Sequence, residues 1–178
     1  MFEKGKWIVY GNTGVCQVED IGIPHDIPVQ DGNKSYYKLN PVYEAGEIYI
    51  PVDTCVFMRP VLTKEEARGL ISKIPAGWEE ENTVTLEEEY QKCLSDHECG
   101  EWMHLLTSIR LREWKMKKQG KRIGKLYHKY EKRAQELLYG ELSVVLGISY
   151  EELEKEIEQQ FSELFAKLQT KAQKTPSH

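Results

Sequence analysis

The feature that most constrains the fold is a change of hydrophobic periodicity at Thr63. Before Thr63, short apolar runs alternate with glycine-rich or polar turn residues, as β-strands require. We expect strands near residues 6–10, 15–21, 35–39, 46–52 and 56–59. Short, closely spaced strands are typical of small barrels, which leave no free sheet edge. Residues 1–62 are therefore predicted to form a small β-barrel domain.

After Thr63, the apolar residues recur with the period of a helix. Thr63 and Glu66 have the spacing of a capping box, which predicts a first helix that runs to about residue 73. Further helices are expected from residue 85, from residue 95 or 96, over 123–146 and from residue 150. Gly120 interrupts the third helix, and Gly147 can end the fourth as a C-cap. The sequence thus predicts an α+β protein with two domains, in which residues 63–169 form a compact helical domain and residues 170–178 a disordered tail.

Composition argues for a cytoplasmic protein with no membrane partner. Charged residues make up 30% of the chain, and no segment approaches the roughly 20 apolar residues of a membrane-spanning helix. The first residues also lack the apolar run of a signal peptide. The four cysteines form no CxxC pair, and a zinc site would need Cys93, His97 and Cys99 plus a fourth ligand, in a spacing that no common zinc module uses. Reduced, partly buried thiols and no metal are expected.

Motifs of catalysis and nucleotide binding are missing from the sequence. It contains no G-x-x-x-x-G-K-[ST], G-x-G-x-x-G, H-E-x-x-H or G-x-S-x-G motif, and the five histidines form no pair with a nucleophile. We therefore expect neither an enzyme nor a binder of a small-molecule substrate or cofactor.

Positive charge is concentrated in one segment. Between Arg110 and Arg133, eleven Lys or Arg residues stand against two acids, whereas the whole chain has a net charge of −5. Such a segment favours phosphate contact, although a charged run can also be a solvated helix face. No feature of it suggests base reading, so DNA binding should be salt-sensitive and largely independent of sequence. The candidate DNA-binding cations are Lys117, Lys118, Lys121, Arg122, Lys125 and Lys129, with Lys121, Arg122 and Lys125 expected at a helix start.

Both halves of the chain resemble a known family of regulators. In the first half, an early aromatic residue and a glycine precede an apolar strand, and a glycine turn leads to the next strand. These residues are Phe2, Gly5, Ile8, Val9, Tyr10, Gly14, Val18 and Ile21, followed later by Tyr36, Tyr37, Lys38, Leu39, Ile50, Pro51, Met58 and Arg59. This pattern resembles the RNA-polymerase-interacting domain shared by CarD-type regulators and transcription-repair coupling factors. The second half resembles the helical domain of CarD-like proteins at Ala134, Leu138, Glu141 and Leu142.

The resemblance implies a fold and a partner for the first domain. It implies a Tudor-like barrel that docks on the β subunit of bacterial RNA polymerase through a strand edge. The strand that matches the family's polymerase-facing strand contains Ile48, Tyr49, Ile50 and Pro51. Tyr49 is the preferred anchor, because tyrosine is common among interface hot spots. Its alternative role is simply to cover the barrel.

The resemblance also implies a DNA contact for the helical domain, at the upstream edge of the promoter bubble. There the family inserts a tryptophan wedge into the minor groove, four residues before a helical tyrosine. Counting back from Tyr90 gives Leu86, and the acidic residues that follow it, Glu87, Glu88 and Glu89, repel phosphate. Trp78 can serve as a displaced wedge or pack against the first helix.

The sequence therefore predicts a transcription regulator that modulates open-complex stability by binding the polymerase β subunit and promoter DNA. One alternative is a polymerase-binding protein whose helical domain contacts a protein rather than DNA. The other is a general protein-interaction module without a link to transcription.

Overall fold

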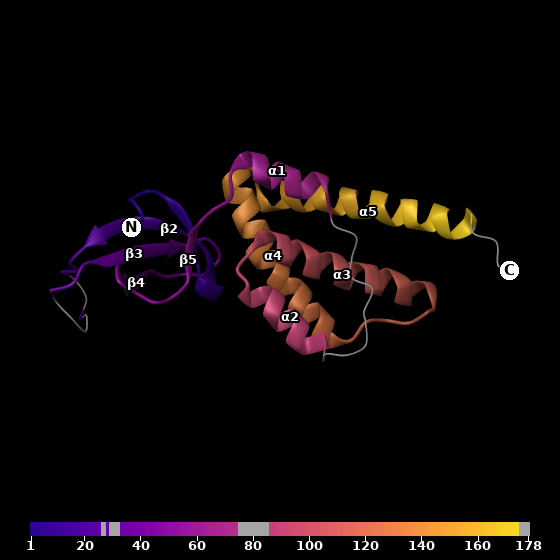
Figure 1. Cartoon of the computed structure of the whole chain (residues 1–178), viewed down its shortest axis with the longest axis horizontal. Helices are drawn as coiled ribbons and strands as arrows, with labels where there is room; N and C mark the ends of the chain where they lie inside the picture. The colour runs from indigo at the N-terminus through magenta and orange to yellow at the C-terminus, as the bar shows by residue number, and fades with distance from the viewer. Residues whose placement is uncertain (26–27, 29–32, 75–85, 175–178) are drawn as a thin grey trace. The chain divides into compact units, whose positions relative to one another are not determined.

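The computed structural model describes residues 1–25, 28, 33–74 and 86–174 (Figure 1). The chain divides into two compact units, Met1–Val61 and Leu62–His178, here called the β unit and the helical unit. The predicted boundary, between residues 62 and 63, lies one residue from this division.

The β unit contains one antiparallel sheet. In the described residues it has five strands, in the spatial order β4-β3-β2-β1-β5. A single turn of 3₁₀ helix, Gly11–Thr13, joins the first two strands, so this connection is the short glycine turn expected from the sequence. The strands are β1 (Trp7–Tyr10), β2 (Gly14–Gly22), β3 (Tyr36–Pro41), β4 (Ile48–Pro51) and β5 (Met58–Pro60).

One face of this sheet buries the core of the β unit. Its members come from alternate positions of β1 to β4, because successive side chains of a strand point to opposite faces. Val18 pairs with Leu39, and Tyr37 pairs with Ile50, so the buried side chains meet across the strands. The buried cluster is Ile8, Cys16, Val18, Tyr37, Leu39 and Ile50.

The predicted closure of the sheet into a Tudor-like barrel is not confirmed. In the described part of the chain, β4 pairs only with β3, and β5 pairs only with β1, so the sheet has two free edges. Both edge strands are short, with four and three residues. A barrel needs pairing between its first and last strands, which local patterns in the sequence do not specify.

The helical unit contains five helices within the described residues, with bounds close to those expected. They are α1 (Lys64–Ser72), α2 (Leu86–Ser95), α3 (Cys99–Lys118), α4 (Lys125–Leu146) and α5 (Tyr150–Lys174). The capping box of Thr63 and Glu66 is present, and Gly147 ends α4 in the left-handed conformation at φ 69°. Both local predictions are thus confirmed.

The core of the helical unit lies between α3 and α4, with α1, α2 and α5 packed around them (Figure 1). The buried side chains of α3 and α4 recur every three or four residues, as helix packing requires. α5 adds a buried row of its own at the same spacing. Members of this core include Trp102, Leu105, Leu106, Ile109, Ala134, Leu138, Leu142, Leu153, Ile157 and Phe161.

Two helix boundaries differ from the prediction. α3 begins at Cys99, not at residue 95 or 96, because His97 has a positive φ of 56° and Glu98 is extended. α5 continues to Lys174, five residues into the predicted disordered tail. No glycine or proline interrupts it before Pro176, which lies outside the described residues.

The cysteines are free thiols, as expected. Cys16, Cys93 and Cys99 are buried, and Cys55 is exposed. Burial, reinforced by Glu101, raises the pKa of Cys93 to about 12, which opposes the thiolate form that binds zinc. Over the described ranges, no cluster of three His, Cys, Asp or Glu side chains has a geometry suited to a metal ion. Likewise, no described helix is long and apolar enough to cross a membrane.

Candidate functional site

At the free edge of β4, the main-chain N–H and C=O of one residue, Tyr49, point away from the sheet. Val52 N–H donates to the carbonyl of Ser35 at 3.0 Å, which sets the alternation of hydrogen-bonded pairs along β3 and β4. The main-chain groups of Ile48 and Ile50 therefore face β3, and those of Tyr49 face outward. Pro51 has no N–H, and its carbonyl accepts from Thr54 N–H at 3.1 Å. A partner strand at this edge thus meets one donor and one acceptor, both on Tyr49.

The side chain of Tyr49 lies on the sheet face opposite the core. Its hydroxyl donates to Glu47 Oε2 at 3.1 Å, and it pairs across the strands with Lys38. Lys38 Nζ lies 2.6 Å from Glu47 and 3.2 Å from Glu19, and the hydrogen bonds to these two acids raise the pKa of Lys38. Partial desolvation and the bond to Glu47 raise the pKa of Tyr49. Tyr49 is thus half-buried, and its contacts with Glu47 and Lys38 hold its side chain in place.

A hollow of about 210 Å³ lies beside Tyr49. It is polar, since acidic, basic and aromatic side chains all reach it. The sequence did not indicate this hollow, because its lining comes from three strands and a connecting segment. The lining residues are Asp20, Gly22, Ile23, Pro24, His25, Tyr36, Lys38 and Tyr49.

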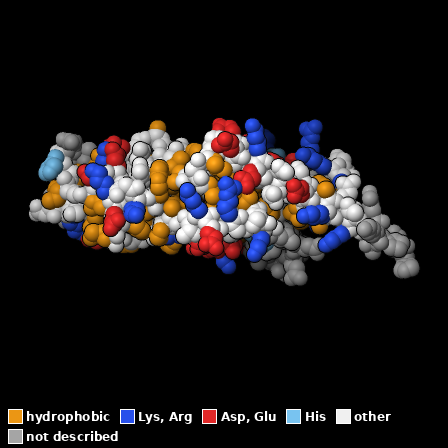
Figure 2. Space-filling view, turned by 90° about the horizontal axis from the view of Figure 1, so that it is seen from above, with side chains coloured by type: hydrophobic (Ala, Val, Ile, Leu, Met, Phe, Trp, Pro, Cys, Tyr) orange, Lys and Arg blue, Asp and Glu red, His pale blue; other side chains and the backbone are white. Residues whose placement is uncertain are grey.

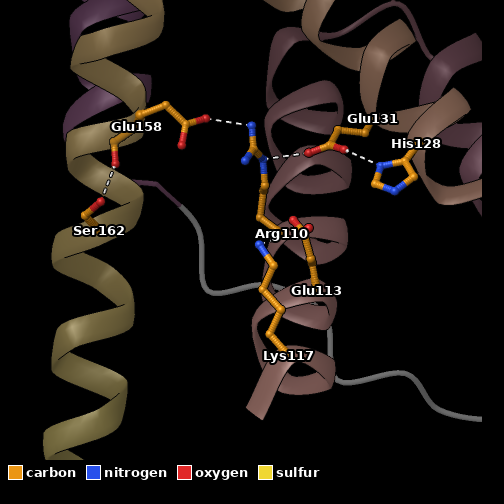
Figure 3. A network of polar contacts seen from close by, with 7 residues as sticks. All are labelled: Arg110, Glu113, Lys117, His128, Glu131, Glu158 and Ser162. Carbon is orange, nitrogen blue, oxygen red and sulfur yellow. Dashed lines mark hydrogen bonds and ion pairs between the residues drawn. The ribbon is translucent and has the colours of Figure 1, made fainter. Parts of the chain in front are cut away.

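Three arginines of the basic segment serve the fold. Arg110 binds Glu131 on α4 at 2.7 Å and Glu158 on α5 at 2.6 Å, so it joins three helices (Figure 3). The guanidinium of Arg112 lies 4.8 Å from the ring centroid of Tyr127. Arg133 binds Glu136 at 3.0 Å. The guanidinium groups of these three arginines are thus engaged in contacts within the helical unit.

The predicted DNA-binding lysines at the end of α3 are exposed but have local partners. Lys117 binds Glu113 at 3.2 Å with 70% of its side chain exposed. Lys118 Nζ lies 3.8 Å from the ring centroid of Trp114, which stacks on Phe165. Such exposed pairs are weak, so both lysines remain available to a ligand.

Lys121 and Arg122 lie in the connection between α3 and α4, a few residues before the helix start at which they were expected. Gly120, at φ 71°, ends α3, with Gly120 N–H bonded to the carbonyl of Lys117 and Lys121 N–H to that of Met116. α4 then begins at Lys125. Among the described residues, Lys121, Arg122 and Lys125 form no ion pair, and all three are exposed.

Lys129 extends this set along the exposed face of α4, one turn after Lys125. Its Nζ lies 5.8 Å from the ring centroid of Tyr130, and its side chain is exposed. The first turn of α4 contains no acid, and no side chain caps it. The predicted cations Lys121, Arg122, Lys125 and Lys129 therefore share an uncompensated positive region.

His128 belongs to the same exposed face and was missed by the sequence reasoning. It stands three residues after Lys125 and four before Lys132, so the helical spacing already placed it there.

Charge is less segregated elsewhere on the helical unit. On the face shown in Figure 2, which looks onto α1 and α5, basic and acidic side chains are interspersed.

The structure does not describe the side chains of the two candidate wedges. Trp78 lies outside the described residues. Leu86 is the first residue of α2, and the structure describes its main chain but not its side chain. Glu87, next to it, accepts a hydrogen bond from the hydroxyl of Tyr130 at 3.3 Å, so the start of α2 is tied to α4. Tyr90 anchors the same contact, with its ring 5.4 Å from that of Tyr130.

Comparison with known proteins identifies the β unit. The family model of the CarD-like/TRCF RID domain matches residues 2–62. No curated protein matches the chain. The matched range ends at the boundary between the two units and contains the whole sheet with its free β4 edge. Residues 2–62 are thus a domain of the CarD-like/TRCF RID family.

Proposed function

We propose that this chain is a non-enzymatic, cytoplasmic transcription regulator that binds RNA polymerase through its β unit and promoter DNA through its helical unit. The match of residues 2–62 to the RID family, the RNA-polymerase-interacting domain of the predicted resemblance, carries the first half of this proposal. The polymerase subunit that we assign as partner is β.

The free β4 edge supports docking by strand addition. In this mode a strand of the partner pairs with an exposed edge, and alternate side chains supply specificity. Tyr49 offers the outward N–H and C=O of β4, and its ring stands beside the hollow. Ile50 fills the core from the same strand, so it positions Tyr49 rather than contacting the partner. Tyr49 is the residue that we expect to dominate binding.

The uncompensated positive region around the start of α4 supports DNA contact. Lys121, Arg122, Lys125 and Lys129 are exposed, whereas the other arginines of the segment contact acids or an aromatic ring; these are Arg110, Arg112 and Arg133. Cations that neutralise phosphates release condensed counterions, so binding of this kind is strong at low salt and insensitive to sequence. We propose that it holds the upstream edge of the promoter bubble and thereby alters open-complex stability.

A second candidate function has the helical unit bind a protein instead of DNA. The acids at the start of α2 favour it, because Glu87 and Glu88 are exposed close to α4 and repel phosphate. A protein partner differs from DNA in its response to salt. For DNA, the slope of log K against log[salt] is about −0.9 for each phosphate that the protein neutralises, and a protein partner lacks this contribution.

Polymerase binding is tested by retention of RNA polymerase on the immobilised full chain. We expect Tyr49→Glu to weaken binding about 30-fold or more, the loss typical of a hot spot of 2 kcal/mol. The matched control is Tyr43→Glu, the same change at an exposed tyrosine of the β unit outside β4. Equal retention of both variants and the wild type would contradict the assignment of Tyr49.

DNA binding is tested by fluorescence anisotropy with a labelled duplex across a range of salt concentrations. Replacing Lys121, Arg122 and Lys125 by glutamine should reduce the slope of log K against log[salt] by about 3. The control replaces three exposed lysines elsewhere in the helical unit, Lys64, Lys155 and Lys167. An unchanged slope in the first variant would favour the protein-binding alternative.

A further inference from the structure

We infer that His128 is a pH-dependent phosphate contact within the basic face of α4, so that this chain binds DNA more tightly as the pH falls. This inference rests on the proposed DNA contact and adds to it one further residue and a direction of regulation.

The placement of His128 is the first step of the argument. In α4, residues 125, 128, 129 and 132 follow the spacing of one helix face. All four are exposed, whereas the opposite face buries Tyr130, Ala134 and Leu138 in the core. The face spans about 10.5 Å along the helix, close to one Debye length at physiological salt. His128 therefore lies inside the field of Lys125, Lys129 and Lys132.

The orientation of the ring is the second step. His128 Nδ1 lies 3.4 Å from Glu131 Oε2, and 55% of the histidine side chain is exposed. Figure 3 shows the other ring nitrogen, Nε2, on the side of the ring away from Glu131. The acid thus holds one nitrogen and leaves the other for a ligand.

The proton on Nε2 decides what that ligand can be. When the neutral ring donates from Nδ1 to Glu131, Nε2 carries a lone pair and repels phosphate oxygen. Protonation makes Nε2–H a charged donor, which attracts phosphate. Histidine is the side chain that undergoes this change between about pH 8 and pH 5.

Charged groups of the neighbouring helices also lie near His128 and Glu131. From α3, Arg110 binds the second oxygen of Glu131 at 2.7 Å, and from α5, Glu158 binds Arg110 at 2.6 Å (Figure 3). From α2, Glu87 reaches α4 at Tyr130. Also from α3, the guanidinium of Arg112 lies 4.8 Å from the ring centroid of Tyr127, the residue before His128. Three acids, Glu131, Glu158 and Glu87, thus stand beside two arginines. The excess of one acid counters only part of the repulsion by the three lysines on the exposed face, and a phosphate bound at Nε2 adds the negative charge that favours the protonated ring.

Charges of α1 lie farther away. α1 begins next to Leu62, whose N–H binds Glu141 of α4. Glu141 is thirteen positions beyond His128, about 20 Å along the helix. Screening at physiological salt makes the contribution of α1 small.

The test measures duplex binding by anisotropy over a salt series at about pH 8 and at about pH 5.5. For the wild type, the slope of log K against log[salt] should be steeper by about 0.9 at the lower pH, the value for one added phosphate contact. His128→Gln should show the shallower slope at both pH values. His128→Lys should show the steeper slope at both. His25→Gln, an exposed histidine of the β unit, is the control and should behave as the wild type.

The outcomes separate this inference from the proposed function. If His128→Gln keeps the pH-dependent slope of the wild type, or if the wild type binds DNA with one slope at both pH values, His128 is not the contact and DNA binding stands. If the wild type binds no DNA at either pH, both proposals fail. Circular dichroism at both pH values establishes that each variant is folded when it is measured.

Discussion

Glu141 lies on α4 with none of its surface exposed, and it joins three parts of the helical unit. Its Oε1 accepts a hydrogen bond from Leu62 N–H at 2.8 Å, and its Oε2 accepts one from the thiol of Cys99 at 3.0 Å. Leu62 is the first residue of the unit, and Cys99 begins α3. A carboxylate is also favoured beside Cys99, because the N-terminus of a helix carries partial positive charge. We therefore predict that Glu141 contributes more to stability than any exposed acid of α4.

The expected loss of stability follows from the two hydrogen-bond donors that lose their acceptor, Leu62 N–H and the thiol of Cys99. Glu141→Leu keeps the bulk of the side chain and removes both acceptors. A buried N–H without an acceptor costs about 1–3 kcal/mol, and a thiol, a weak donor, adds less. Removing a buried charge regains part of its desolvation energy. We expect a loss of about 2 kcal/mol for Glu141→Leu, or about 8 °C in Tm for a unit of this size. Glu141→Gln should lose about 1 kcal/mol, because its carbonyl oxygen still accepts from Leu62.

The assay is urea unfolding followed by far-ultraviolet circular dichroism, which reports mainly on the helices. Glu136→Leu is the control, since this acid of α4 is 37% exposed and forms only surface ion pairs with Lys132 and Arg133. It should change the free energy of unfolding by less than about 1 kcal/mol. If Glu141→Leu is no more destabilising than Glu136→Leu, the carboxylate does not hold the unit together, and the reasoning is refuted.

Three further predictions concern other parts of the chain. Cys55 should react with a thiol reagent in the folded protein at about pH 8, whereas Cys93, buried and with its pKa raised to about 12, should react only after unfolding; equal rates would contradict this. Gly120→Ala should lower the stability of the helical unit by about 1 kcal/mol, because the residue has a φ of 71°, and a neutral effect in urea unfolding would argue against that turn. A double-mutant cycle on Arg68 and Glu156 should give a coupling of at most about 1 kcal/mol, because both side chains of this 2.8 Å pair are exposed; a coupling above about 2 kcal/mol would contradict the surface geometry.

Local signals predicted the elements and several of their ends. The capping box at Thr63, the stop at Gly120 and the left-handed Gly147 depend on a few neighbouring residues, so they are legible in the sequence. The start of α3 could not be predicted, because a positive φ is uncommon at any residue other than glycine and no local pattern marks His97 as an exception. Closure of the sheet could not be predicted from the sequence either, since it depends on pairing between distant strands.

The candidate site was predictable only as a list of charges. Arg110 and Lys121 look alike in the sequence, but the first is bound by Glu131 and Glu158 from two other helices. Which cations remain available is a property of packing between α3, α4 and α5. Similarly, the sequence placed Tyr49 on a strand, while the outward direction of its N–H follows from the pairing register with β3.

The shortness of the free β4 edge has a consequence for solubility. Edge strands with long rows of unpaired main-chain groups recruit other copies of the same chain and start aggregation. β4 has four residues, Pro51 removes one donor, and Thr54 occupies the carbonyl of that proline. Lys38, Glu19 and Glu47 further surround the edge with charge. An edge with a single open donor and acceptor is too small to propagate a sheet through self-association, and it can still accept one strand whose side chains match the surface beside Tyr49.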